Sequence, residues 1–173
     1  METGRTVRIS VRSNEDEAPR ISLWPSISAD GHYIAFESLA RLGRRDHDGR
    51  VDVYVRDRRR GVTREASVSS AGVDGNGYSD FPEISADGQT VAFRSSSSNL
   101  AAHTPELGPN VFVRDLATRR TSRLHVSGGT WPAAISDHGR FVLFFNYYEV
   151  PNGIQLYLRD RRRQTTQRVS FGL

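Results

Sequence analysis

The pentapeptide ISADG stands at residues 27–31, recurs unchanged at 84–88, and returns as ISDHG at 135–139. The neighbours of each copy recur with it, as WPSISADGHYIAFES at 24–38, FPEISADGQTVAFRS at 81–95 and WPAAISDHGRFVLFFN at 131–146. After a polar stretch of variable length follow DVYVRDRRRG at 52–61, NVFVRDLATRR at 110–120 and QLYLRDRRR at 155–163. A recurring word with matching neighbours indicates a repeated structural unit, here present three times.

Each unit contains four short runs rich in Val, Ile, Phe and Tyr, which predict β-strands. The words SADG and DHG place a small polar residue before glycine between the first two runs, the chemistry of a tight hairpin turn. The RDRRRG and RDLATRR words close a second hairpin between the third and fourth runs. Because no helix-period segment with caps interrupts this pattern, the fold class is predicted to be all-β.

Four-stranded antiparallel units repeated about every 50 residues are typical of β-propeller blades. The sequence predicts one domain over 1–173 with blades at about 21–70, 78–127 and 129–171. The word order xPxISADGxxxAFxS … DVxVRDxxxGxTxRVS resembles the repeat of the TolB-like, WD-repeat-like β-propeller family over nearly the whole chain. That resemblance implies a propeller scaffold for protein or ligand binding; an open β-sandwich is the alternative fold.

The segment TVRISVRS at 6–13 is predicted to be an extra N-terminal outer strand. Thr6, Arg8, Ile9 and Ser10 align with Thr166, Arg168, Val169 and Ser170 of the last fourth strand. Three blades are half of the six that the family resemblance implies, so a homodimer is expected to complete the ring. The expected contact surfaces are Ile34, Phe36, Val53 and Val55 on one chain and Phe144, Phe145, Leu156 and Leu158 on the other. A longer propeller, or closure with another domain, is the alternative.

Composition restricts the classes of partner. The formal net charge is +4 and the pI about 9.9, yet the 24 basic residues, all of them Arg, are interleaved with 20 acidic ones. This interleaving argues against a nucleic-acid partner, which requires positive charge concentrated on one face. No apolar run approaches the roughly 18 residues of a membrane-spanning helix, so no membrane partner is expected. With no cysteine, disulfides and thiolate sites are excluded.

The expected compartment follows from the first residues of the chain. METGRTVRISVRS lacks the apolar core of a secretory signal. The protein is therefore expected in the cytoplasm as written, or in a secreted or periplasmic location if a leader was removed.

Two loops fit the pattern D-x-[DN]-G-x-x-D. Asp46, Asp48 and Asp52 surround Gly49 in DHDGRVD, and Asp74, Asn76 and Asp80 surround Gly77 in DGNGYSD. Alternating carboxylate and amide oxygens before a glycine turn suit Ca²⁺, so both loops are candidate calcium sites. The alternative is that these residues only form tight turns.

Trp24, Phe81 and Trp131 each stand immediately before the proline of the first strand of a unit, a position expected to open on the propeller axis. Such aromatic residues could stack on a sugar, a base or a peptide side chain. Alternatively, they pack one blade against the next. The third copy also contains one residue more, WPAAIS against WPSIS.

The sequence thus predicts a noncatalytic binding or assembly module that recognises a protein or small ligand on the long-loop rim near the axis. The alternative is a propeller-scaffold enzyme of lyase or hydrolase type that uses His47 and the neighbouring carboxylates. No nucleophile-elbow or paired-histidine motif supports catalysis.

Overall fold

The computed structural model describes residues 4, 6–43, 49–102, 109–124, 130–146 and 154–170. These residues form three four-stranded antiparallel sheets, and no helix occurs among them. Blade 1 contains β1 (Ser22–Ile27), β2 (Tyr33–Ser38), β3 (Asp52–Asp57) and β4 (Val62–Glu65). Blade 2 contains β5 (Ser79–Ile84), β6 (Thr90–Ser95), β7 (Asn110–Asp115) and β8 (Arg120–Arg123). Blade 3 contains β9 (Thr130–Ile135), β10 (Phe141–Asn146), β11 (Gln155–Asp160) and β12 (Thr165–Arg168).

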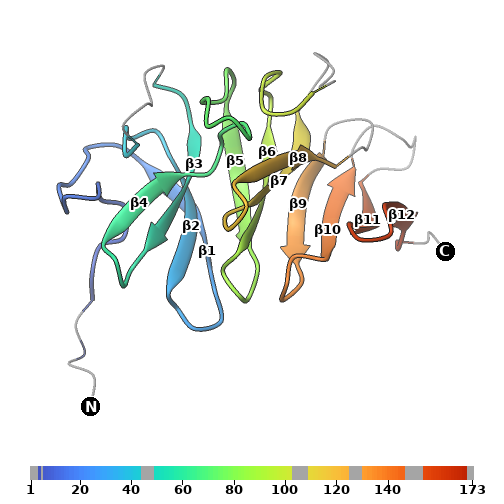
Figure 1. Ribbon diagram of the computed structural model, residues 1–173, viewed down its shortest axis with the longest axis horizontal. Coiled ribbons are helices and arrows are strands. Elements are labelled where there is room, and N and C mark those ends of the chain that lie inside the picture. Colours follow the sequence, from blue (N-terminus) through green and yellow to red (C-terminus); the bar gives the residue numbers. More distant parts are fainter. Residues whose placement is uncertain are drawn as a thin grey trace.

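The three sheets stand side by side, each ordered sequentially from its first to its fourth strand (Figure 1). The first strands β1, β5 and β9 are neighbours and form the inner side of the array. The hairpins that follow them lie together at one end, at the bottom of Figure 1. This is the all-β blade arrangement that the repeats predict. The described part of the chain has no helix long and apolar enough to cross a membrane.

The SADG word builds the first hairpin of blade 1 through its own side chains. Ser28 Oγ lies 2.8 Å from Asp30 Oδ1, which also accepts the His32 N–H at 3.0 Å. Gly31 N donates to Ser28 O at 2.8 Å, with Gly31 at φ +66°. The equivalent Gly88 and Gly139 have φ +69° and +66°, so all three copies require the left-handed conformation that glycine adopts without strain.

Apolar residues of facing sheets form the core between blades. At the junction of blades 1 and 2, the buried residues are Ala35, Val53, Val55 and Ala66 from blade 1 and its connection, with Ile84, Val91, Phe93, Leu100 and Phe112 from blade 2. At the junction of blades 2 and 3, they are Ala92, Val111, Val113 and Leu124, with Val142 and Phe144. Both faces of blade 2 are therefore buried, and its strands are apolar at successive positions.

The outer faces of the array are only partly covered. On blade 1, Ile34, Phe36 and Tyr54 are buried beneath Ala18, Ala40, Leu42 and Ile9 of the same chain. Ile27 of blade 1 is 60% exposed, whereas the equivalent Ile84 of blade 2 is 5% exposed because blade 1 covers it. At the other end, Leu143, Leu156 and Leu158 of blade 3 are only partly buried. Their equivalents in blades 1 and 2 lie within the junctions.

The predicted strand at residues 6–13 is not a strand. Within that segment, Val11 alone makes a bridge, to Glu17. Ile9 packs against the apolar cluster on the outer face of blade 1. The prediction was wrong because a strand needs a partner strand, and no sheet precedes β1 in the part of the chain that the structure describes.

The same segment nevertheless repeats the connection that links blade 1 to blade 2. The isolated bridge Val11–Glu17 recurs as Val68–Asp74, 57 residues later. Thr63 Oγ1 donates to Val11 O at 2.6 Å, and Thr121 Oγ1 donates to Val68 O at 2.6 Å. Residues 6–18 therefore have the structure of the end of a blade and its connection, placed before blade 1.

Candidate functional site

The three aromatic residues predicted from the repeats line one cavity. It has a volume of about 300 Å³ and is lined by Trp24, Pro25, Phe81, Pro82, Glu83, Trp131, Pro132 and Phe145. These residues come from the inner strands of all three blades and from β10. We call this the aromatic cavity.

Ring contacts order the walls of the aromatic cavity. The ring centroids of Trp24 and Phe81 are 5.0 Å apart, and those of Trp131 and Phe145 are 5.2 Å apart. The Arg94 guanidinium lies 4.6 Å above the Phe81 ring and also pairs with Asp80 at 2.5 Å. Trp24 nevertheless remains 57% exposed, so part of its ring area is available to a ligand.

Backbone bulges place Trp24 and Phe81. Trp24 has φ +49° and Phe81 φ +48°, in the left-handed region that bulky residues rarely adopt. In both strands, the aromatic residue and its proline lie between two regular cross-strand pairs. The bulge therefore turns the aromatic side chain out of the regular alternation of the strand.

Trp131 is not at the same position as Trp24 and Phe81, which corrects the expected equivalence. Trp131 pairs with Phe145 in regular register. It therefore occupies the position that Leu23 occupies in β1 and Asp80 in β5, which pair with Glu37 and Arg94. The bulge of β9 lies at the same place in its sheet, opposite Phe144, but Pro132 and Ala133 occupy it instead of an aromatic residue and its proline. Trp131 still reaches the aromatic cavity, one register position away from the other two.

Two glutamates lie beside the aromatic rings. Burial raises the pKa of Glu37, against the opposing effect of the Phe81 N–H, which donates to Glu37 Oε2 at 2.9 Å. Burial likewise raises the pKa of Glu83, and the Ser26 hydroxyl, 3.1 Å from Glu83 Oε2, partly offsets it. The cavity wall thus combines aromatic faces with one carboxyl group, that of Glu83, whose charged form is disfavoured, while Glu37 holds the backbone of Phe81.

The candidate calcium loops are described only in part. Asp46 and Asp48 lie outside the described residues, and Asp52 is buried with its Oδ1 accepting a hydrogen bond from Ser67 Oγ. In the second loop the side chain of Asp80 pairs with Arg94, while the Asn76 amide bonds to Ser98. Among the described residues, no group of three or more His, Asp or Glu side chains could hold a metal ion. Calcium binding stays a prediction.

The catalytic alternative has no described centre. His47 lies outside the described residues. His32 Nε2 lies 2.7 Å from Asp57 Oδ1, and its ring stacks on Tyr33 at 4.1 Å. This pair braces the two hairpins of blade 1, with the side chains of His32 and Asp57 only 13% and 12% exposed.

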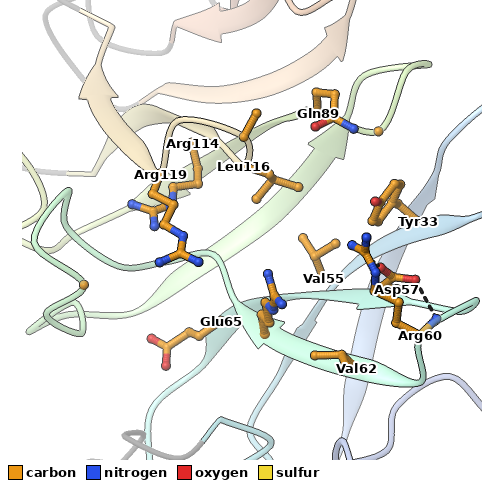
Figure 2. Close-up of a pocket in the computed structure, with 14 residues that line it drawn as sticks. Tyr33, Val55, Asp57, Arg60, Val62, Glu65, Gln89, Arg114, Leu116 and Arg119 are labelled. Atoms are coloured by element: carbon orange, nitrogen blue, oxygen red, sulfur yellow. Dashed lines mark hydrogen bonds and ion pairs between the residues drawn. The ribbon is translucent and has the colours of Figure 1, made fainter.

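A second cavity, which the sequence interpretation missed, opens between blades 1 and 2. It has a volume of about 430 Å³, and we call it the interblade cleft. Figure 2 shows Leu116 and Val55 in its middle, Arg114 and Arg119 on one side, and Arg60 with Asp57 on the other. The signal that could have revealed it is the residue after each RD word, which is Arg58 in the first repeat and Arg161 in the third, but Leu116 in the second.

No protein-family model matches the sequence. No curated protein matches it either. Solved structures do match, among them TolB from Acinetobacter baumannii, with 22% identity and a TM-score of 0.58 over 91% of this chain and 33% of that chain. The β-propeller domain of the Trilobed protease from Pyrococcus furiosus, described as having an open velcro topology, matches with 14% identity and a TM-score of 0.56 over 86% of this chain and 41% of that one. An oligogalacturonate lyase in complex with manganese matches with 11% identity and a TM-score of 0.59 over 90% and 43%.

These likenesses show the fold. The chain has a TolB-like β-propeller architecture and spans between a third and a half of the length of these structures. Because the same fold carries TolB, a protease domain and a lyase, the scaffold alone does not determine the activity.

Proposed function

We propose that this chain is a noncatalytic β-propeller module that binds a protein or small ligand at the aromatic cavity. The observation that carries the proposal is the convergence of Trp24, Phe81 and Trp131, from three inner strands, on one cavity. Aromatic faces favour flat, partly apolar groups, such as a sugar ring or an aromatic side chain. The neighbouring Glu83 and Arg94 offer polar groups that would orient such a ligand.

The chain carries its own probe for this site, because its two tryptophans are Trp24 and Trp131. Tryptophan emission therefore reports on the aromatic cavity alone. Titration with a panel of oligosaccharides, nucleosides and aromatic peptides is expected to give a saturable change with at least one class. Phe81→Ala should weaken that response at least tenfold. A panel without any saturable change, or an unchanged response in F81A, contradicts the proposal.

We further propose that two copies associate to complete the propeller. In each internal junction, one half comes from the later blade and contains Ile84 or Ile135; the outer face of blade 1 is equivalent to this half. The other half comes from the earlier blade, and the outer face of blade 3 is equivalent to it. The same contact that joins blades 1, 2 and 3 would therefore join two chains twice around a twofold axis. Val53, Val55 and Phe144, expected at this interface, instead lie in the internal junctions. Ile34 and Phe36 are buried within the chain on the outer face of blade 1, and Phe145 lines the aromatic cavity. In the proposed dimer, Ile27 and the leucines of blade 3 would make the contact.

Closure of the ring would displace one short segment. Ser170 Oγ accepts a hydrogen bond from Leu156 N of β11, just as Ser67 Oγ accepts one from Val53 N of β3. Ser10 stands at the position of Ser67 in the repeat. Val169 and Ser170 therefore follow β12 at the positions that Ile9 and Ser10 occupy before blade 1. Thr6, Val7 and Arg8 are exposed, whereas Val169 N donates to Leu156 O at 2.8 Å. The N-terminal residues are therefore the ones that would give way.

Light scattering over a dilution series tests the assembly. The wild-type chain is expected to be a dimer, and Ile27→Glu should give a folded monomer because Ile27 is 60% exposed within one chain. A wild-type mass that stays at 19.4 kDa at all concentrations would reject a second copy as the occupant of the outer faces.

A further inference from the structure

The interblade cleft exists because one residue departs from the repeat. Leu116 N donates to Gln89 O at 2.8 Å, just as Arg58 N donates to His32 O at 3.0 Å and Arg161 N to Arg140 O at 2.9 Å. The three residues are therefore at one structural position. Only at the second repeat is that position occupied by a short apolar side chain.

The two arginines show what normally fills the space. The guanidinium of Arg161 reaches across the base of blade 3 to Gly139 O at 2.6 Å and interacts electrostatically with Asp115 of blade 2. Arg58 makes the equivalent bond to Gly31 O at 2.8 Å. Leu116 instead packs beside Tyr33 and against the apolar cluster of blades 1 and 2. An apolar floor therefore stands where the junction of blades 2 and 3 contains a cation.

Four arginines surround that floor. They are Arg60, Arg64, Arg114 and Arg119, against two carboxylates, Asp57 and Glu65. Arg114 Nη1 bonds to Ser69 O and Thr121 Oγ1, and Asp57 is partnered by His32 and Arg60. The side chains of Arg64 and Arg119 are exposed and make no hydrogen bond or ion pair with the described residues. The cleft thus has an excess of positive charge on its rim.

The backbone of Arg119 has the left-handed conformation of its turn. Its φ is +58°, a left-handed conformation that it shares with the equivalent Gly61 (φ +64°) and Gln164 (φ +57°). Glycine adopts this conformation without strain, whereas arginine does not. Because Gln164 shares this conformation, it belongs to the turn of the repeat, and the turn fixes the place of Arg119 at the rim of the cleft.

We propose that the interblade cleft binds a small amphipathic organic anion. Its apolar body lies on Leu116, Val55 and Tyr33, and its carboxylate or phosphate head is held by Arg64 and Arg119. Guanidinium groups bind such heads through short, charge-assisted hydrogen bonds, and the apolar floor provides the additional burial that an inorganic anion would not use. This site is separate from the aromatic cavity and does not depend on the function proposed for it.

Isothermal titration with four probes tests the proposal: phenyl phosphate, phenylacetate, benzyl alcohol and inorganic phosphate. The two aromatic anions should bind saturably. Benzyl alcohol, which lacks the charge, and inorganic phosphate, which lacks the apolar body, should bind at least tenfold more weakly. Because neither anion approaches Trp24 or Trp131, tryptophan emission should stay unchanged, which separates this site from the aromatic cavity.

Leu116→Arg is the decisive variant, since it restores the residue that the other two repeats contain at this position. It should fold, with an unchanged circular dichroism spectrum, and should lose binding of both aromatic anions. Arg119→Gln, which introduces the residue of the third repeat, should weaken binding about tenfold and provides an independent test if L116R does not fold. Unchanged affinity in either folded variant, equal affinity for benzyl alcohol or inorganic phosphate, or no binding of either aromatic anion by the wild type would overturn the proposal.

Discussion

At the scale of single residues, Glu83 of the aromatic cavity makes the stability of the fold depend on pH. Burial raises the pKa of its carboxyl group, so the folded chain favours the protonated form. The wild type therefore has its full stability below the ordinary pKa of glutamate and loses part of it as the pH rises through the raised pKa. Glu83→Gln removes this loss while keeping an acceptor for the Ser26 hydroxyl.

We expect E83Q to raise the melting temperature by roughly 1–3 °C at about pH 8 and by nearly nothing at about pH 4. The effect is small because the carboxyl is only half-buried and solvent screens it. Thermal denaturation of both proteins at the two pH values measures it. A gain of equal size at both values would show that charge on Glu83 is not its cause.

Replacing Arg119 with glycine is expected to stabilise the fold, although it removes a group proposed to bind the anion. Arg119→Gly introduces the residue that blade 1 contains at the same left-handed position, Gly61. Relief of backbone strain should exceed the greater entropy of glycine in the unfolded chain, giving a net stabilisation of about 0.5–1 kcal/mol. Urea denaturation checks this, and a destabilised R119G would mean that the arginine side chain stabilises the hairpin by contacts of its own.

The residues of the two cavities show how far the sequence alone could predict the candidate sites. The sequence correctly predicted that Trp24, Phe81 and Trp131 lie in one region, because each precedes a proline at the start of an inner strand. It did not predict that the bulge of β9 keeps its place in the sheet while Trp131 lies one position before it, since one inserted residue can be absorbed at several points of a strand. Leu116 was equally hard to interpret, because its effect becomes visible only when the structure shows what the arginines at the same position contact in the other two blades.

At the scale of elements, the hairpin glycines measure how tightly neighbouring blades pack. A Cβ on Gly88 would lie 2.4 Å from Tyr33 Cδ2 of blade 1, whereas a Cβ on Gly31 would meet nothing closer than Arg58 Nη1 at 3.6 Å. Both glycines have positive φ, so alanine carries the same backbone strain at either position. Gly88→Ala should cost about 2–4 kcal/mol and Gly31→Ala about 1 kcal/mol in a single chain.

Thermal denaturation in dilute solution compares the two variants, with G31A serving as the matched control for backbone strain. The difference between them isolates the contact of the turn with the preceding blade. Equal losses in G88A and G31A would mean that the ring of Tyr33 moves aside without cost, and that this contact does not hold the blades in place.

The elements themselves were largely predictable, because alternating apolar runs and Asp-Gly or His-Gly turns determine strands and hairpins locally. The segment at 6–13 was the exception. Its Thr, Arg and Ser match a fourth strand residue by residue, but strand formation depends on a partner that lies elsewhere in space. Local sequence therefore identified the origin of this segment in the repeat and not its conformation.

At the scale of the whole molecule, Gly31 distinguishes a closed ring from an open array. A Cβ on Gly88 would contact Tyr33 of blade 1, and a Cβ on Gly139 would contact Thr90 of blade 2. The residue of blade 3 at the same position as Tyr33 and Thr90 is Phe141, which is partly exposed beside Arg140. In the proposed dimer, Phe141 of one chain would therefore face Gly31 of the other. Gly31→Ala, mild within one chain, should then clash across the interface as G88A does within it, and weaken dimerisation at least tenfold in a light-scattering dilution series. If G31A and wild type dissociate at the same concentration, the first blade of one copy does not meet the last blade of the other in the register of the internal junctions.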